Sequence, residues 1–108
     1  MSRITELLGE SIIASSDNGG NGLEGTPIGA ANTLVGIYTP DLCPETCYLE
    51  ASADNIDWRR VQVFGVDVVL SENRFIIVDG LPCKFLRAAS DTPVTGDRSF
   101  KFWRILDI

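Results

Sequence analysis

Residues 46–63 alternate apolar and polar side chains on both sides of a short acidic turn. They read TCYLEASADNIDWRRVQV. The alternation over residues 48–53 is typical of a strand with one buried face, because successive side chains of a strand point to opposite sides. Residues 54–57 carry side chains that bond to the backbone in turns, and Trp58 begins a second apolar alternation. The segment therefore predicts a β-hairpin.

Similar short segments recur along the rest of the chain, with turn-forming residues between them. The predicted strands span residues 34–38, 46–53, 58–64, 67–70, 74–78, 84–90 and 99–106. They are rich in Val, Ile, Phe and Trp, and no amphipathic helical pattern separates them. The spacing predicts an all-β fold, an antiparallel β-sandwich of about seven to eight strands.

Residues 1–32 have a different composition. A short apolar cluster is followed by a glycine-rich stretch that cannot bury enough apolar surface to fix its own conformation. We therefore expect a flexible, extended N-terminal arm over residues 1–32 and a single β-sandwich domain over residues 33–108. The arm is either a disordered leader or a segment that becomes ordered across a neighbouring subunit. The apolar cluster favours the second interpretation.

The last predicted strand carries large apolar side chains on both faces. Phe100 and Phe102 lie on one side, and Trp103 and Ile105 lie on the other. The second face is either covered by the N-terminal segment or exposed and buried on assembly. The second interpretation predicts an interface formed by Leu7, Leu8, Ile12, Ile13, Trp103 and Ile105.

The charge and hydropathy of the chain argue against two kinds of partner. The formal net charge is −6, with nine Lys and Arg residues that form only one adjacent basic pair, whereas binding to nucleic acid needs a concentrated cationic face. No apolar run approaches the ~20 residues that cross a bilayer. The N-terminus lacks the pattern of a secretory leader. We expect synthesis in the cytoplasm and binding to neither nucleic acid nor membrane.

Candidate catalytic and metal-binding residues are weak. The chain has no histidine, which is the residue best suited to proton transfer near neutral pH and the commonest metal ligand. An enzyme is therefore less favoured, and we expect no catalytic site, no metal and no cofactor. Asp54 and Asp57 are interpreted as caps of a turn, not as paired catalytic carboxylates. Cys43, Cys47 and Cys83 are interpreted as small, reduced, buried residues, with a Cys43–Cys47 disulfide or a metal site as alternatives.

A resemblance adds to this picture. The succession LEASADNIDWRRVQVFGVDVVL, RFIIVDGLPCKFLRAAS and DRSFKFWRI is similar to a small β-sandwich domain of tailed-phage virion proteins, over residues 46–108. The matching residues are Ser52, Asp54, Trp58, Phe85, Leu86, Arg87, Ser90, Asp97 and Arg98. The resemblance implies a decoration (cement) protein that stabilises a phage capsid on the outside of the virion. Its implied partners are the major capsid protein and further copies of itself, as a dimer or trimer.

An alternative function uses the aromatic residues. Tyr38, Tyr48, Trp58 and Trp103 are available to stack on sugars. If two of them were exposed side by side, the chain would fit a carbohydrate- or receptor-binding module of a phage tail appendage. Trp58 is interpreted as a core residue.

Overall fold

A computed structural model describes residues 3–15, 23–29, 33–81 and 83–107 of the 108-residue chain. Every regular element in these ranges is a β-strand, and all of the strand pairings are antiparallel. The strands are β1 (Arg3–Ile13), β2 (Ile28–Gly29), β3 (Thr33–Tyr38), β4 (Cys47–Ser52), β5 (Arg59–Arg60), β6 (Gln62–Val63), β7 (Val66–Asp67), β8 (Phe75–Leu81), β9 (Phe85–Ser90) and β10 (Arg98–Asp107). The predicted all-β class is confirmed.

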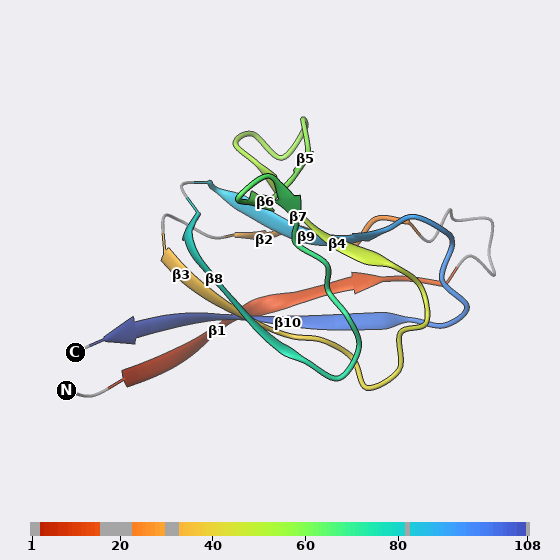
Figure 1. The fold of residues 1–108 in the computed structure, drawn as a ribbon, viewed down its shortest axis with the longest axis horizontal. Coiled ribbons are helices and arrows are strands. Elements are labelled where there is room, and N and C mark those ends of the chain that lie inside the picture. Colours follow the sequence, from red (N-terminus) through yellow and green to blue (C-terminus); the bar gives the residue numbers. More distant parts are fainter. Residues whose placement is uncertain (1–2, 16–22, 30–32, 82, 108) are drawn as a thin grey trace.

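The strands form two four-stranded sheets and a separate hairpin. Sheet A has the order β1-β10-β3-β8, sheet B has the order β2-β9-β4-β5, and β6 pairs with β7. Figure 1 shows sheets A and B as two layers, with the hairpin beside sheet B. The molecule is thus an antiparallel sandwich, as the sequence predicts. The predicted hairpin over residues 46–63 is confirmed by the pairing of β4 with β5.

The core lies between the two sheets and follows from the two-residue period of each strand. In β10, Phe100 and Phe102 are completely buried, whereas Lys101 between them is exposed. Leu49 and Leu86 of sheet B are also completely buried in the same core cluster. Burying one such side chain stabilises the fold by roughly 1.5–3 kcal/mol. The side of sheet A that faces sheet B is called its inner face, and the opposite side its outer face.

The N-terminal segment differs from the predicted arm. In place of a flexible extension, β1 is an edge strand of sheet A and pairs with β10 from Arg3 to Ile13. Ser11 and Ile13 point to the inner face and are completely buried. The two-residue period is interrupted by a bulge between Leu7 and Gly9, where Gly9 has a φ of +155°. Because of this bulge, the sequence of the segment does not show the continuous two-residue alternation of a regular strand.

Residues 23–29 tie this edge of sheet A to sheet B. The backbone N–H of Gly25 donates to the carbonyl of Ala88 in β9 (2.8 Å), and that of Thr26 donates to the carbonyl of Ile12 in β1 (3.2 Å). The N–H of Ala88 donates in turn to the Ser11 hydroxyl (2.9 Å). The sandwich therefore includes described residues on both sides of the predicted boundary at residue 32. The rest of the predicted arm, residues 1–2, 16–22 and 30–32, lies outside the described residues.

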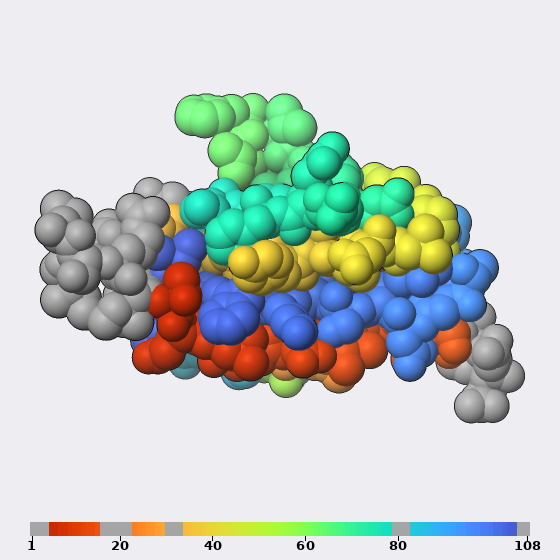
Figure 2. All heavy atoms as spheres, turned by 90° about the horizontal axis from the view of Figure 1, so that it is seen from below, coloured from red at the N-terminus to blue at the C-terminus, as the bar shows by residue number. Residues whose placement is uncertain are grey.

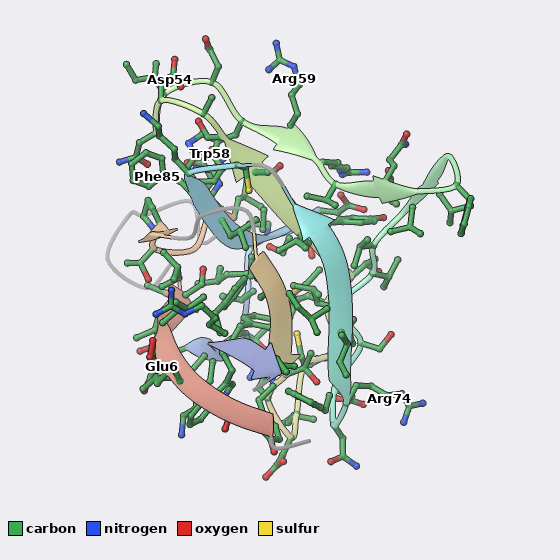
Figure 3. All side chains as sticks on the ribbon, turned by 90° about the vertical axis from the view of Figure 1, so that its left-hand side faces the viewer. Glu6, Asp54, Trp58, Arg59, Arg74 and Phe85 are labelled. Carbon is green, nitrogen blue, oxygen red and sulfur yellow. The ribbon has the colours of Figure 1, made fainter. Side chains whose placement is uncertain are left out.

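The predicted strand over residues 58–64 is divided. Its first part is β5, and its last part is β6, which turns back into β7 through Phe64 and Gly65. The break at Val61 turns its backbone N–H toward the carbonyl of Leu49 (2.9 Å), and its side chain is buried. Because Val61 is held in the sandwich, the β6–β7 hairpin extends away from the sheets (Figure 3).

Candidate functional site on the outer face of sheet A

The outer face of sheet A is rich in exposed apolar side chains. Register places Leu7 of β1 beside Trp103 of β10, and Tyr38 of β3 beside Phe75 of β8. Tyr38 is 51% exposed, Phe75 is 44% exposed, and Ile77 and Leu7 are each 51% exposed. Figure 2 views this face directly, with β8, β3, β10 and β1 crossing it as adjacent bands. Contiguous exposed apolar surface of this kind marks interaction sites.

Three aromatic residues, Tyr38, Phe75 and Trp103, form an aromatic cluster on this face. The ring centroids of Tyr38 and Phe75 are 4.5 Å apart, and those of Tyr38 and Trp103 are 6.2 Å apart in an edge-to-face arrangement. Both separations are in the range that favours aromatic pairing. The indole N–H of Trp103 is buried and has no acceptor among the described residues. Packing therefore holds this ring in place.

Gly36 allows the cluster to lie flat on the sheet. A Cβ atom at this position would come within 2.7 Å of Cε1 of Phe75 and 3.2 Å of Cδ1 of Ile105. Glycine is thus needed for the Phe75 ring to pack over β3. The close packing also leaves Ile105 only 5% exposed, although it belongs to the outer face by register.

Two hollows lie beside the aromatic cluster. The larger has a volume of about 430 Å³, and its lining includes Tyr38, Asp41, Ser99, Lys101 and Trp103. The smaller, of about 170 Å³, is lined by Thr5, Tyr38, Phe75 and Trp103. The larger hollow combines aromatic rings with hydroxyl and charged groups, whereas three of the four residues lining the smaller are aromatic. The two hollows therefore suit different kinds of ligand.

The predicted interface residues divide into two groups. Leu7, Ile12 and Trp103 lie on the outer face, as an interface requires. Leu8 packs against the core, and Ile13 is completely buried in it, so the prediction that these two side chains contact a partner has to be corrected. The sequence predicts both in an arm, whereas β1 turns them inward. Ile105 is covered by its own neighbours.

Sequence reasoning missed Phe75 and Ile77 as surface residues. The available signal was the run of consecutive apolar residues at the start of β8, which places large side chains on both faces of the strand. Ile76 points inward, and Ile77 points outward. The sequence indicates Tyr38 only as one of four aromatic residues that could stack on sugars. The pairing of β3 with β8 brings Tyr38 and Phe75 together, and neither local sequence indicates that pairing.

Trp58 lies on the other side of the molecule, near the turn that carries Asp54 (Figure 3). Its ring is half-buried, and the guanidinium of Arg87 lies 4.2 Å from the ring centroid. Arg87 also pairs with Glu50 (2.8 Å). This cation–π contact occupies one face of the indole. Trp58 is not among the buried core residues, so its interpretation as a core residue is wrong.

The Asp54 turn is closed by its own backbone. Oδ1 of Asp54 accepts hydrogen bonds from the N–H groups of Ile56 and Asp57, both at 2.9 Å. These bonds lower the pKa of Asp54, because they stabilise the carboxylate. Asn55 adopts a φ of +63°, which asparagine tolerates in turns. The interpretation of this acidic tip as a capped turn is confirmed.

The cysteines are free thiols. Cys43 and Cys47 are buried with their Sγ atoms 3.4 Å apart, and Cys83 is half-buried. Burial raises the pKa of all three thiols above the usual value. The predicted burial is confirmed for Cys43 and Cys47, whereas Cys83 is only partly buried. Thiols with raised pKa values are poor nucleophiles at neutral pH.

Arg98 and Glu45 form a buried ion pair beside Cys43 and Cys47. Nε of Arg98 lies 2.9 Å from Oε1 of Glu45, and their side chains are 9% and 7% exposed. The hydrogen bond from Arg98 is the main cause that lowers the pKa of Glu45.

The described residues contain no group of three or more Cys, Asp and Glu placed to hold a metal ion. None of the described segments forms a helix that is long and apolar enough to span a membrane.

We compared the chain with models of protein families, with curated proteins and with solved structures, and none of the three comparisons found a match.

Proposed function

We propose that this protein is a non-enzymatic structural protein that binds other proteins through the outer face of sheet A. The observation that carries the proposal is the aromatic cluster, in which Tyr38 and Phe75 remain about half exposed beside Trp103. Tyr, Phe and Trp are enriched at protein interfaces, and Tyr and Trp are enriched among the few residues that provide most of the binding energy. A fold needs only one apolar face on such a sheet, so the second is available for a partner.

The specific role that we propose is decoration of a phage capsid, by binding to the outer surface of the major capsid protein lattice. The sequence resemblance over residues 46–108 supports this role. The net charge of −6 also fits, because an acidic surface complements a basic patch on a partner and speeds association. Binding to the assembled shell stabilises it by mass action, since the ligand prefers the intact state.

The proposal is tested with capsid shells prepared without this protein. Wild-type protein should co-sediment with the shells, and the double variant Tyr38→Ser, Phe75→Ser should bind at least about tenfold more weakly. The matched control is Ile56→Ser, which removes an apolar side chain that is 78% exposed in the Asp54 turn, away from sheet A. Thermal unfolding should show that all three proteins are folded. Wild-type binding by the double variant would exclude this face as the attachment surface.

A second candidate function is carbohydrate binding at the larger hollow. It is favoured by the position of the Tyr38 and Trp103 rings beside Asp41, Ser99 and Lys101, because sugars stack on aromatic faces and bond to polar groups at the rim. Fluorescence titration of a Trp58→Phe variant, in which Trp103 is the only tryptophan, with a panel of sugars tests this. Unchanged emission and no heat of binding by calorimetry would reject the second candidate.

A further inference from the structure

The β6–β7 hairpin ends in a cluster of exposed apolar side chains. Val63 is 45% exposed, Val66 is 67% exposed, and Phe64 between them is 101% exposed. These three residues are called the apolar tip. Figure 2 shows the surrounding segment projecting beyond the β8 edge of sheet A. A fully exposed phenylalanine contributes nothing to the core, and three exposed apolar side chains on one hairpin form a candidate contact surface.

The backbone at the tip adds a second argument. Phe64 has a φ of +53° and Gly65 has a φ of +77°, which is the pattern of a type I′ turn. Asparagine is the preferred residue at the first position of such a turn, and a bulky side chain with positive φ is strained. The phenylalanine is therefore unfavourable for the hairpin and unused by the core. Strain that persists in this way is concentrated at functional positions.

The base of the hairpin is held by polar contacts. Arg60 pairs with Asp67 (3.1 Å) and with Asp91 (2.7 Å), and its guanidinium lies 3.8 Å from the ring centroid of Tyr48. The side-chain amide of Gln62 donates to Asp67 (2.9 Å). These contacts fix the direction of the hairpin, so the apolar tip is presented at a defined position relative to the sandwich.

A matching surface is present on the same chain. The smaller hollow, of about 170 Å³, is lined by Thr5, Tyr38, Phe75 and Trp103. An aromatic ring entering it would meet three other rings, for which edge-to-face contacts are favourable. The hollow lies on the outer face of sheet A, whereas the hairpin projects sideways beyond the edge of that sheet (Figure 2). The tip of one molecule therefore cannot fill its own hollow, but it can fill the hollow of another.

We propose that the apolar tip of one copy inserts Phe64 into the smaller hollow of a second copy. This inference rests on the proposed function, because it names a partner for the same face of sheet A. The contact joins two different surfaces, so each copy offers one tip and one hollow. Such a heterologous contact repeats from copy to copy and forms a ring or an open chain.

The test measures self-association of the full chain without any other protein. Light scattering coupled to size-exclusion chromatography should show that the mass of the wild-type protein rises with concentration. Phe64→Asn should weaken association at least about tenfold, while the hairpin is retained because Asn-Gly suits a type I′ turn. The matched control Ile56→Asn removes another highly exposed apolar side chain and should associate like the wild type.

A mixing experiment tests the geometry. Thr5→Phe fills the smaller hollow but keeps the tip, whereas Phe64→Asn keeps the hollow but lacks the aromatic tip. Each variant alone should be monomeric, and an equimolar mixture should form a one-to-one pair that does not grow further. Only a heterologous contact allows this rescue.

The inference would be overturned by a wild-type protein that stays monomeric at every concentration, or by a mixture of the two variants that does not pair. Equal association of Phe64→Asn and the wild type would also overturn it. The shell-binding assay tests the proposed function separately from this contact between copies. Loss of shell binding in the Tyr38, Phe75 double variant, together with a monomeric wild type, would reject the contact between copies and leave the attachment surface intact.

Discussion

Both faces of sheet A carry large apolar side chains, but the inner face is buried and the outer face is largely exposed. On the inner face, Phe100 and Phe102 are completely buried under sheet B. On the outer face, Tyr38 and Phe75 are about half exposed, and no described residue of another layer covers them. The pleat separates the two sets, since neighbouring residues such as Phe102 and Trp103 point in opposite directions. The inner face is therefore used for folding, and the outer face is available for association.

The first and largest prediction compares one residue from each face. Phe102→Ala should lower the free energy of unfolding by about 3–5 kcal/mol, because it removes a completely buried ring and leaves a cavity. Tyr38→Ala should lower it by about 1 kcal/mol or less, because half of the side chain already contacts water. Denaturation by urea measures both. Equal losses would mean that the outer face is part of the folding core.

The second prediction concerns two arginines in the inner-face row of β10. Arg98 pairs with Glu45 in a buried site, whereas Arg104 pairs with Glu6 through side chains that are 40% and 50% exposed. Glu45→Gln should destabilise the protein by about 3 kcal/mol, because it leaves the Arg98 charge buried without a counter-charge. Glu6→Gln should cost about 0–1 kcal/mol. Urea midpoints of the two variants give the comparison, and similar midpoints would contradict it.

The third prediction follows from the pKa of Glu45, which its hydrogen bond with Arg98 lowers. A carboxyl with a lowered pKa in the folded state contributes stability that is fully present above its unfolded pKa of about 4.3. That contribution is lost as the pH falls through the folded pKa. The wild-type protein should therefore lose stability below about pH 4.3 more steeply than Glu45→Gln does. Parallel curves of stability against pH would show that the ion pair does not titrate as described.

Part of this arrangement could be predicted from the sequence. The alternation in β4 and in the first half of β10 is visible within each segment, because it depends only on neighbouring residues. The bulk on both faces of β10 correctly marked Trp103 as an outer-face residue. The sequence also predicts Leu7 and Ile12 on a surface, although on an arm and not on a strand.

The rest depends on contacts between distant residues. Leu7 lies beside Trp103 only because β1 pairs with β10 across nearly the whole chain, and Tyr38 meets Phe75 only because β3 pairs with β8. The bulge before Gly9 hides the strand period of β1, so the sequence predicts Leu8 and Ile13 on a surface although they point inward. The position of Phe64 at the tip requires the left-handed turn, which its sequence disfavours.

The fourth prediction changes the outer face without removing an aromatic ring. A methyl group in Gly36→Ala would collide with the Phe75 ring, which is 44% exposed and can swing outward. We expect a loss of stability of about 1 kcal/mol and a change in the smaller hollow. The methyl resonances of Ile105, which lie against the same site, should shift in NMR spectra. Unchanged Ile105 resonances would mean that the ring stays in place.

The last prediction uses two neighbouring isoleucines in β8. Ile77 is 51% exposed on the outer face, whereas Ile76 packs against the core from the inner face. Ile77→Thr keeps a β-branched side chain that suits a strand, so the free energy of unfolding should change by no more than about 0.5 kcal/mol. Ile76→Thr places a hydroxyl among apolar side chains and should cost about 1–3 kcal/mol. Urea denaturation measures both variants. A stability loss at Ile77 that matched the loss at Ile76 would show that the outer face is buried in solution. That result would support association through this face even in the protein alone.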